Sequence, residues 1–323
     1  PFLRWLSGQG AKVILCTSER GLHVLHGNPH IDVLVPYVTD SVPMDELPGW
    51  MRKTAQGHGA DFMLNLTGSI EHSLSPIWSD PLYKFPKWER ALRCNKNYYE
   101  FVWEYVGAKD LCPKDSASLR PEMHFTEAED TEIRSWLGEN LQFGERLMVV
   151  CWTGSGPAKK YPWMEYLIGE ALHAHPELTC VVVGQAEVDL SRLHAETGGR
   201  ICSRMTSWSF RKASLAASLA DVVVSPDTGI LHAAGAFPVP KVGILGANSV
   251  ENITKHFEND YSVAANPKLA GCAPCHRIIY DDNLQVCPHD SLTGAVWCMD
   301  VAMDHERLAK NIHEALSCGY ENA

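Results

Sequence analysis

A short run of β-branched apolar residues at 221–225 is followed by residue types that can form an anion-binding site, beginning with Asp227, Thr228 and Gly229. The run predicts a buried strand, and the residues after it predict a turn into a helix. A helix N-terminus offers free N–H groups and the positive end of the helix dipole, so this turn suits a diphosphate. His232 lies about one turn into the helix and is expected to face the same crevice. An ordinary N-cap with a glycine for tight packing would show the same pattern.

A second set of phosphate-binding residue types follows an apolar run at 147–152, and its turn contains Thr153, Gly154, Ser155 and Lys159. The spacing matches neither a P-loop nor a complete dinucleotide fingerprint. Glycines, hydroxyls and a lysine at the end of a strand nevertheless suit a phosphate group. We therefore interpret the turn as a second part of the anion site, with a flexible surface loop as the alternative.

Asp-Thr-Gly-x-x-His at 227–232, followed by small residues and Pro-x-Pro-x-Val-x-x-x-Gly at 238–246, resembles the donor-site signature of a known family. This is the ADP-heptose:lipopolysaccharide heptosyltransferase family, glycosyltransferase family 9. The family has Lys-x-x-Pro after a Thr/Ser-rich turn, and Lys159 with Pro162 fits that spacing. A Gly-Gly-x-x-Glu-like turn of the family, whose acid holds the nucleoside, implies this role for Glu187, although Gln185 replaces the second glycine.

The catalytic base is expected in the first half of the chain. In the resembled family a Gly-Asp pair, in a turn before the first helix, carries the usual base; this sequence begins with the back half of that helix and does not show the pair. Glu71 and His72 follow a third predicted strand at 61–66, where a polar loop after a parallel strand binds ligands. Either could act as the general base. The alternative is a carboxylate at a helix start beside a surface histidine.

Basic residues recur at every third position between 84 and 96: Lys84, Lys87, Arg90, Arg93 and Lys96. Aromatic residues lie among them, and the helix that carries them is expected to continue to Val106. Three-residue spacing places several of these charges on one helix face. Lys87, Arg90 and Arg93 are the candidate seat for an anionic acceptor, such as a phosphorylated glycan. A nucleic-acid strand is possible but not favoured, and a solvated helix face is the alternative reading.

Four cysteines gather near the end of the sequence: Cys272, Cys275, Cys287 and Cys298. Cys-x-x-Cys is one half of many zinc sites, and His276 and His289 are further ligand candidates. Four thiolates leave no open coordination position, so the predicted zinc would be structural. Unbound thiols in a loop are the alternative. No Asp-x-Asp metal motif is visible, and no cofactor is expected for catalysis.

The composition of the 323 residues, 45% hydrophobic and 21% charged, is that of a globular protein with substantial cores. A net charge of −11 argues against general binding to nucleic acid or anionic membranes. No apolar run reaches the roughly 20 residues of a membrane span. No signal peptide is visible, and eleven cysteines without one favour a cytoplasmic location.

Strands and helices are predicted to alternate along the whole chain. Besides the strands named above, strands are expected at 12–16, 31–35, 179–183 and 241–245, and helices at 44–57, 126–141, 207–219, 230–237 and 304–316. This pattern predicts an α/β fold with parallel sheets. The resemblance implies two doubly wound Rossmann-like domains facing a cleft, the glycosyltransferase-B type. The expected limits are an acceptor domain at 1–140 and a donor domain at 141–323.

The resulting hypothesis is an inverting transfer of a heptose-like sugar from a nucleotide diphosphate to an acceptor hydroxyl. Lys159 would neutralise the charge that grows on the leaving group. Two alternatives remain: a nucleotide-sugar epimerase on the same fold, and a non-catalytic protein that binds sugar nucleotides or glycans.

Overall fold

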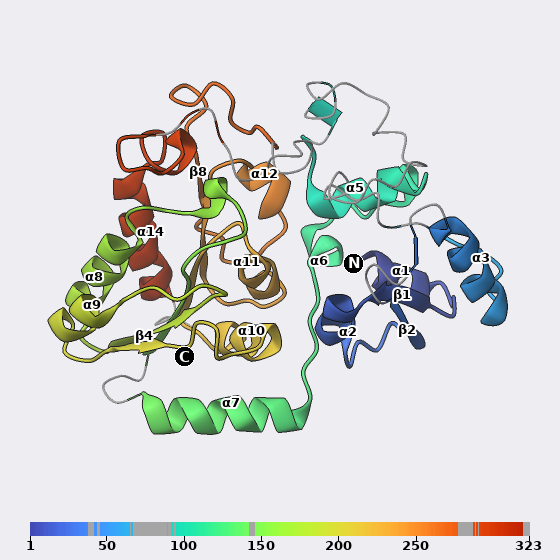
Figure 1. Cartoon of the computed structure of the whole chain (residues 1–323), viewed down its shortest axis with the longest axis horizontal. Coiled ribbons are helices and arrows are strands. Elements are labelled where there is room, and N and C mark those ends of the chain that lie inside the picture. Colours follow the sequence, from blue (N-terminus) through green and yellow to red (C-terminus); the bar gives the residue numbers. More distant parts are fainter. Residues whose placement is uncertain are drawn as a thin grey trace.

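The protein has two lobes in the computed structural model, with helix α7 running beneath the second one (Figure 1). The structure describes residues 1–37, 42–43, 46–64, 66, 89, 92–93, 95–141, 146–276, 287, 289 and 291–318. The first lobe comprises the elements from Phe2 to Leu119, and the second those from Glu127 to Cys318.

The second lobe contains a six-stranded sheet of parallel strands in the order β5-β4-β3-β6-β7-β8. The chain passes from β5 to β6 across the sheet, so the sheet is extended first on one side of β3 and then on the other. The strands are β3 (Arg146–Cys151), β4 (Leu178–Val183), β5 (Ile201–Ser203), β6 (Val222–Pro226), β7 (Lys241–Leu245) and β8 (Val263–Ala264).

Helices cover both faces of this sheet. They are α7 (Glu127–Asn140), α8 (Met164–Ala174), α9 (Ser191–Glu196), α10 (Phe210–Ser218), α11 (Gly229–Ala234), α12 (Val250–Ile253) and α14 (His305–Cys318), with short 3₁₀ turns η4 (Pro157–Lys159) and η5 (Trp297–Met299). The four strand predictions at 147–152, 179–183, 221–225 and 241–245 are confirmed to within one residue at either end.

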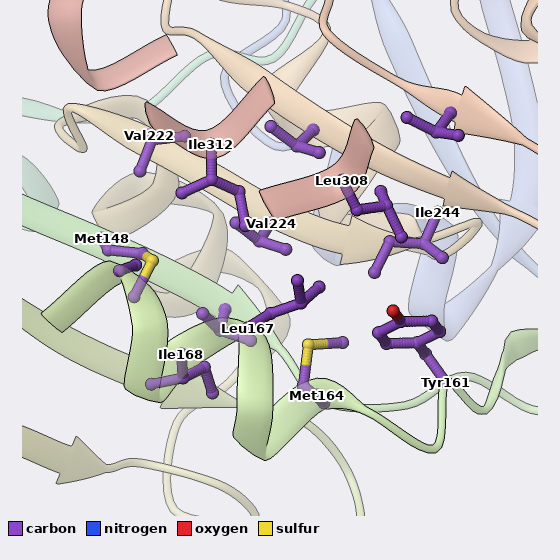
Figure 2. Packing of buried hydrophobic residues seen from close by; sticks show 14 of the residues in the cluster. Met148, Tyr161, Met164, Leu167, Ile168, Val222, Val224, Ile244, Leu308 and Ile312 are labelled. Carbon is purple, nitrogen blue, oxygen red and sulfur yellow. The ribbon is translucent and has the colours of Figure 1, made fainter. Parts of the chain in front are cut away.

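Side chains alternate between the two faces, as a pleated strand requires. Met148 and Val150 of β3 point into a core with α8 and α14, whereas Leu147 and Val149 pack against α7, α10 and α11. Figure 2 shows the first of these cores, where Leu167 of α8 and Ile312 of α14 approach the sheet. Because β3 and β4 are buried on both faces along their whole length, their sequences are apolar without alternation except at Arg146 and Thr179.

The first lobe has a pair of parallel strands, β1 and β2, and several helices. Its elements are α1 (Phe2–Gly8), β1 (Ile14–Ser18), α2 (Glu19–Leu25), β2 (Val33–Tyr37), α3 (Leu47–Gly57), α5 (Tyr98–Tyr105), η3 (Lys109–Leu111) and α6 (Ser116–Leu119). No helix of the described residues is long and apolar enough to span a membrane.

Two predictions for the first lobe are wrong. Residues 61–64 and 66 form no strand, and Phe62 is 89% exposed, because no described strand lies beside them to pair with. The helix of the basic residues does not run on to Val106 either. Asn97 has an extended backbone, and its side chain accepts hydrogen bonds from the N–H groups of Tyr99 and Glu100, so that a new helix, α5, begins at Tyr98.

Arg211 joins the two lobes. Its guanidinium, on α10, donates to both carboxylate oxygens of Glu129 at 2.6 and 2.7 Å. The same group donates to the carbonyls of His23 and His26 at the end of α2, and to that of His124. Glu129 also completes the predicted capping box with Thr126 at the start of α7. One buried arginine therefore ties α2, the start of α7 and α10 together.

Candidate functional site

A cavity of about 520 Å³ lies at the carboxyl ends of β3, β4 and β6. This is the edge of a parallel sheet at which ligands bind in open α/β folds, near the point where the strand order reverses. Eight of the nine predicted donor-binding residues line the cavity: Thr153, Gly154, Ser155, Lys159, Asp227, Thr228, Gly229 and His232. The two predicted anion-binding turns thus meet in one pocket.

Asp227 is the most constrained polar residue of the cavity. Asn248 Nδ2 donates to Asp227 Oδ2 at 2.6 Å, His232 Nε2 lies 3.2 Å from Oδ1, and Lys159 Nζ lies 3.7 Å from Oδ2. Burial opposes ionisation of Asp227, but the charge of Lys159 and the contacts with His232 and Asn248 outweigh it and hold the pKa of this carboxyl well below its usual range. Asp227 is therefore an anion that orients Lys159 and His232 at the pocket.

The turn between 153 and 160 folds back on itself and places the Lys159 side chain in the cavity. The N–H of Gly154 donates to the carbonyl of Lys159, and Thr153 pairs with Lys160 in an antiparallel bridge. A Cβ on Gly154 would lie 2.7 Å from Lys159 Cβ, so a glycine is needed where the lysine crosses over the turn. The Lys159 side chain is consequently only 13% exposed, with its ammonium group beside Asp227.

Thr228 is the N-cap residue of α11, but its hydroxyl does not cap the helix. It lies 2.8 Å from Ser225 Oγ and donates to Cys151 Sγ instead. The first turn of α11 therefore keeps backbone N–H groups without intrahelical partners, as every helix start does. Gly229 is required next, because a Cβ there would lie 2.8 Å from the ring of Phe210.

Glu187 is the predicted donor residue that does not line the cavity. Its side chain is exposed and accepts a hydrogen bond from Thr206 Oγ1 at 2.9 Å. Its neighbours Gly184, Gln185 and Ala186 line the pocket, so the predicted turn reaches the site through other residues.

Sequence reasoning missed several residues of this site. Trp208 and Phe210 line the cavity, Asn248 binds Asp227, and Tyr99 Oη lies 2.8 Å from His232 Nδ1. Asn248 lies three residues after the last residue of the strand β7, so a polar residue in the loop after a parallel strand was an available signal. Nothing in the local sequence indicates that Tyr99, 133 positions away, would contact His232.

Most predicted residues of the first lobe lie outside the described residues: Glu71, His72, Lys87 and Arg90. Arg93 is exposed and bonds to Glu89, four residues earlier, at 2.7 Å. Lys96 pairs with Glu104. At least two of the basic side chains therefore have acidic neighbours.

The four predicted zinc ligands are free thiols. Cys298 is buried, and burial, followed by the charges of Cys275, Cys287 and Cys272, raises its pKa to about 12. Cys272, Cys275 and Cys287 thus all lie close enough to Cys298 to raise its pKa. Within the described part of the chain, however, no three His, Cys, Asp or Glu side chains are grouped as metal ligands. The zinc site remains a prediction.

Residues 91–278 match the family described as glycosyltransferase family 9 (heptosyltransferase). Three solved structures share the fold. ADP-heptose lipopolysaccharide heptosyltransferase II of Escherichia coli is 14% identical, with a TM-score of 0.62 over 99% of this chain and 94% of that one. A family 9 glycosyltransferase of Veillonella parvula is 13% identical, with a TM-score of 0.67 over 100% and 93%. The E. coli heptosyltransferase WaaC, solved with ADP, is 14% identical, with a TM-score of 0.52 over 80% and 87%.

None of the curated protein sequences matches this chain significantly. The family match nevertheless covers more than half of the chain and includes the β6-α11-β7 unit that lines the cavity. The two lobes with parallel sheets are those of the glycosyltransferase-B type seen in the similar structures. The chain belongs to glycosyltransferase family 9, the heptosyltransferases, and is a nucleotide-sugar glycosyltransferase.

Proposed function

We propose that the cavity binds a nucleotide-diphosphate sugar and that the enzyme transfers a heptose-like sugar, with inversion, to the hydroxyl of an anionic acceptor. One observation carries the proposal: Lys159, Asp227 and His232 come together beside the start of α11 in a cavity of about 520 Å³. E. coli WaaC, which shares the fold, was solved with ADP, which supports a nucleoside diphosphate as the ligand.

The diphosphate would be held by Lys159, the hydroxyls of Thr153 and Ser155, and the N–H groups of Thr228 and Gly229. During transfer the acceptor oxygen bonds to the anomeric carbon, and the bond from that carbon to the phosphate oxygen breaks. The nucleoside diphosphate leaves with the electron pair, so negative charge grows on its terminal phosphate. A cation already fixed in a largely buried site stabilises this charge without reorganising.

The nucleoside is proposed to lie at the other end of the cavity, which is lined by Gln185, Trp208 and Phe210. The ring of Trp208 rests edge-on against Trp136, with centroids 4.7 Å apart, and so offers a supported aromatic surface. Aromatic rings stack well on nucleobases. Glu187, next to this end, would bind the ribose hydroxyls.

The acceptor is proposed to approach from the first lobe, where Lys87, Arg90 and Arg93 would bind its negative charge and Glu71 or His72 would be the base that takes the hydroxyl proton. We also propose the domain limits 1–140 and 141–323 for acceptor and donor binding; α7, which falls within the first range, packs on the sheet of the second lobe. A location in the cytoplasm fits a nucleotide donor and the described cysteines, which are all free thiols.

A structural zinc on Cys272, Cys275, Cys287 and Cys298 is part of the same proposal. The nearness of the other three thiols to Cys298, whose pKa they raise, supports it. When bound, the metal would hold the loop between the first and last cysteine closed. It would have no part in sugar transfer.

Release of free nucleotide tests the function. The full chain is mixed with ADP-heptose or with UDP-hexoses, each with and without a lipopolysaccharide-core acceptor, and nucleoside diphosphate is measured. We expect release only when a donor and an acceptor are both present. If calorimetry detects no binding of any nucleoside diphosphate to the protein, the donor assignment of the cavity is wrong.

A further inference from the structure

Tyr99 reaches the donor site from the first lobe. Its hydroxyl lies 2.8 Å from His232 Nδ1, while His232 Nε2 lies 3.2 Å from Asp227 Oδ1. The ring of Tyr98 stacks on the same imidazole, with centroids 6.1 Å apart and planes inclined by 17°. His232 is thus held at both nitrogens and on one face.

The protons of this chain of contacts can be assigned from its two ends. Asp227 is ionised and can only accept, so the nitrogen that faces it, Nε2, carries hydrogen. Burial, with the nearby charge of Asp227, raises the pKa of Tyr99 well above its usual range, so its hydroxyl keeps its proton. A neutral imidazole then donates from Nε2 to Asp227 and accepts from Tyr99 at Nδ1, and all three groups are satisfied.

The position of Tyr99 is set by the docking of α5 on the second lobe. Asn97, the N-cap of α5, donates from Nδ2 to the carbonyl of Glu251 at 2.9 Å, and Asn252 Nδ2 donates back to the carbonyl of Lys96. Glu100, one residue beyond Tyr99, accepts from His256 Nε2 at 2.9 Å. Tyr99 therefore stands between two fixed neighbours and packs against Phe257.

We propose that Tyr99 is a positioning residue that holds His232 in the neutral Nε2–H form, directed at Asp227, and so completes the donor site from the first lobe. The proposal rests on the proposed role of Asp227 and His232 in donor binding. It adds that the donor half of the site is not self-sufficient. The orientation of His232, and through Asp227 that of Lys159, depends on a helix of the other lobe.

The charged and titratable groups around His232 are few enough to allow a clear test. Asp227 faces it from the end of β6, Tyr98 and Tyr99 face it from α5, and Lys159 acts through Asp227. Of these, only Tyr99 changes in Tyr99→Phe. The variant removes the hydrogen bond to His232 Nδ1 and leaves the contact of Nε2 with Asp227 in place.

Nitrogen-15 NMR of the histidines in the full chain measures the tautomer and the hydrogen bonding of each ring nitrogen, with the His232 signals assigned by their loss in His232→Gln. In the wild-type protein we expect an unprotonated Nδ1 and a protonated Nε2 at neutral pH. In Tyr99→Phe the Nδ1 signal should shift, because this nitrogen loses the hydrogen bond that it accepts. Turnover should fall severalfold, with little change in donor KM.

Tyr161→Phe is the matched control. Its hydroxyl lies 2.7 Å from His305 Nδ1, so the variant removes the same type of bond outside the donor cavity. It should leave the Nδ1 signal of His232 unchanged. A protonated Nδ1 in the wild-type protein, or an Nδ1 signal of His232 that does not move in Tyr99→Phe, would overturn the proposal. The NMR readout needs no donor, so failure of the proposed function would show separately, as absence of turnover in the wild-type enzyme.

Discussion

At the scale of single residues, the site is organised around a buried anion rather than around a cation. Asp227 is 6% exposed and faces Lys159, His232 and Asn248. Since Lys159 balances Asp227 before any ligand binds, a diphosphate has to share this lysine with the carboxylate. Lys159 and Asp227 therefore act as a unit, and removing one leaves the other without its partner of opposite charge.

Lys159→Ala should lower kcat/KM by about a hundredfold or more, because it removes the cation nearest the leaving phosphate. The side chain is only 13% exposed and pairs with Asp227, so a modest loss of thermal stability should accompany the loss of activity. Steady-state kinetics and a melting curve measure the two effects. Lys160→Ala, an exposed neighbour in the same turn, is the control and should behave like the wild type. Full activity in Lys159→Ala would show that this lysine does not contact the diphosphate.

At the scale of elements, two sets of contacts position the helices and loops near the cavity. Arg211 fastens α10 to α2 and to the start of α7, next to Phe210 in the cavity wall. Met299 of η5 lies against Gly246, just after β7, and would clash with any side chain at that position.

Glu129→Gln should lower the free energy of unfolding at neutral pH by about 1–3 kcal/mol, because Arg211 loses a charged, doubly bonded partner. Arg211 lowers the pKa of Glu129 from 4.5 to about 2. A depressed carboxylate pKa stabilises the fold above the unfolded value, and this contribution is lost as the pH falls through the folded value. The difference between variant and wild type should therefore shrink between about pH 4.5 and pH 2.

Chemical denaturation at several pH values measures this difference. Glu127→Gln, an exposed acid in the same first turn of α7, should have little effect at any pH. A destabilisation by Glu129→Gln that is independent of pH would contradict the ionic explanation.

The cysteine loop should bind about one zinc ion per chain. Cys272→Ser combined with Cys275→Ser should release the metal and lower the melting temperature, since metal-binding energy contributes directly to folding. Elemental analysis of protein prepared without chelators gives the metal content. Cys16→Ser with Cys112→Ser, which alters two thiols of the first lobe, should leave the metal in place. Absence of metal from the wild-type protein would refute the zinc prediction.

At the scale of the whole molecule, the two lobes contribute unequal numbers of residues to the proposed donor site. The second lobe holds nearly all of the described donor site, and the first lobe adds Tyr99 through α5. Apposing a donor site and an acceptor site aligns two substrates, which supplies a large part of the acceleration of many bimolecular reactions. If the acceptor binds to the first lobe, the charge of that lobe should affect the KM of the acceptor and not the KM of the donor.

Arg90→Glu with Arg93→Glu changes the charge of the first lobe by four units and should raise the acceptor KM steeply without changing the donor KM. The acceptor KM of the wild type should also worsen with salt, since screening weakens exposed charge interactions. Kinetics at two ionic strengths, with each substrate varied in turn, measures both effects. Arg52→Glu with Lys53→Glu makes the same change in charge on α3 and is the control. If the two double variants have the same acceptor KM, the basic residues form an ordinary solvated helix face. The ion pair of Arg93 with Glu89 is consistent with that outcome for Arg93.

The sequence by itself determined the strands of the second lobe and most of the predicted residues that line its cavity. Its strands are mainly apolar because both faces are buried, and glycines and polar residues follow them because a parallel sheet exposes its carboxyl edge. Those local signals were sufficient to predict that Thr153, Lys159, Asp227 and His232 lie together at this edge.

The tertiary structure decided strand pairing and the contacts between distant residues, for which the local sequence carries no signal. The strand expected at 61–66 fails because a strand needs a neighbour, and pairing is not encoded in one segment. The contact of Tyr99 with His232 joins residues 133 positions apart, and only the docking of α5 brings them together. Spacing places residues on an element, whereas the packing of elements decides which side chains meet.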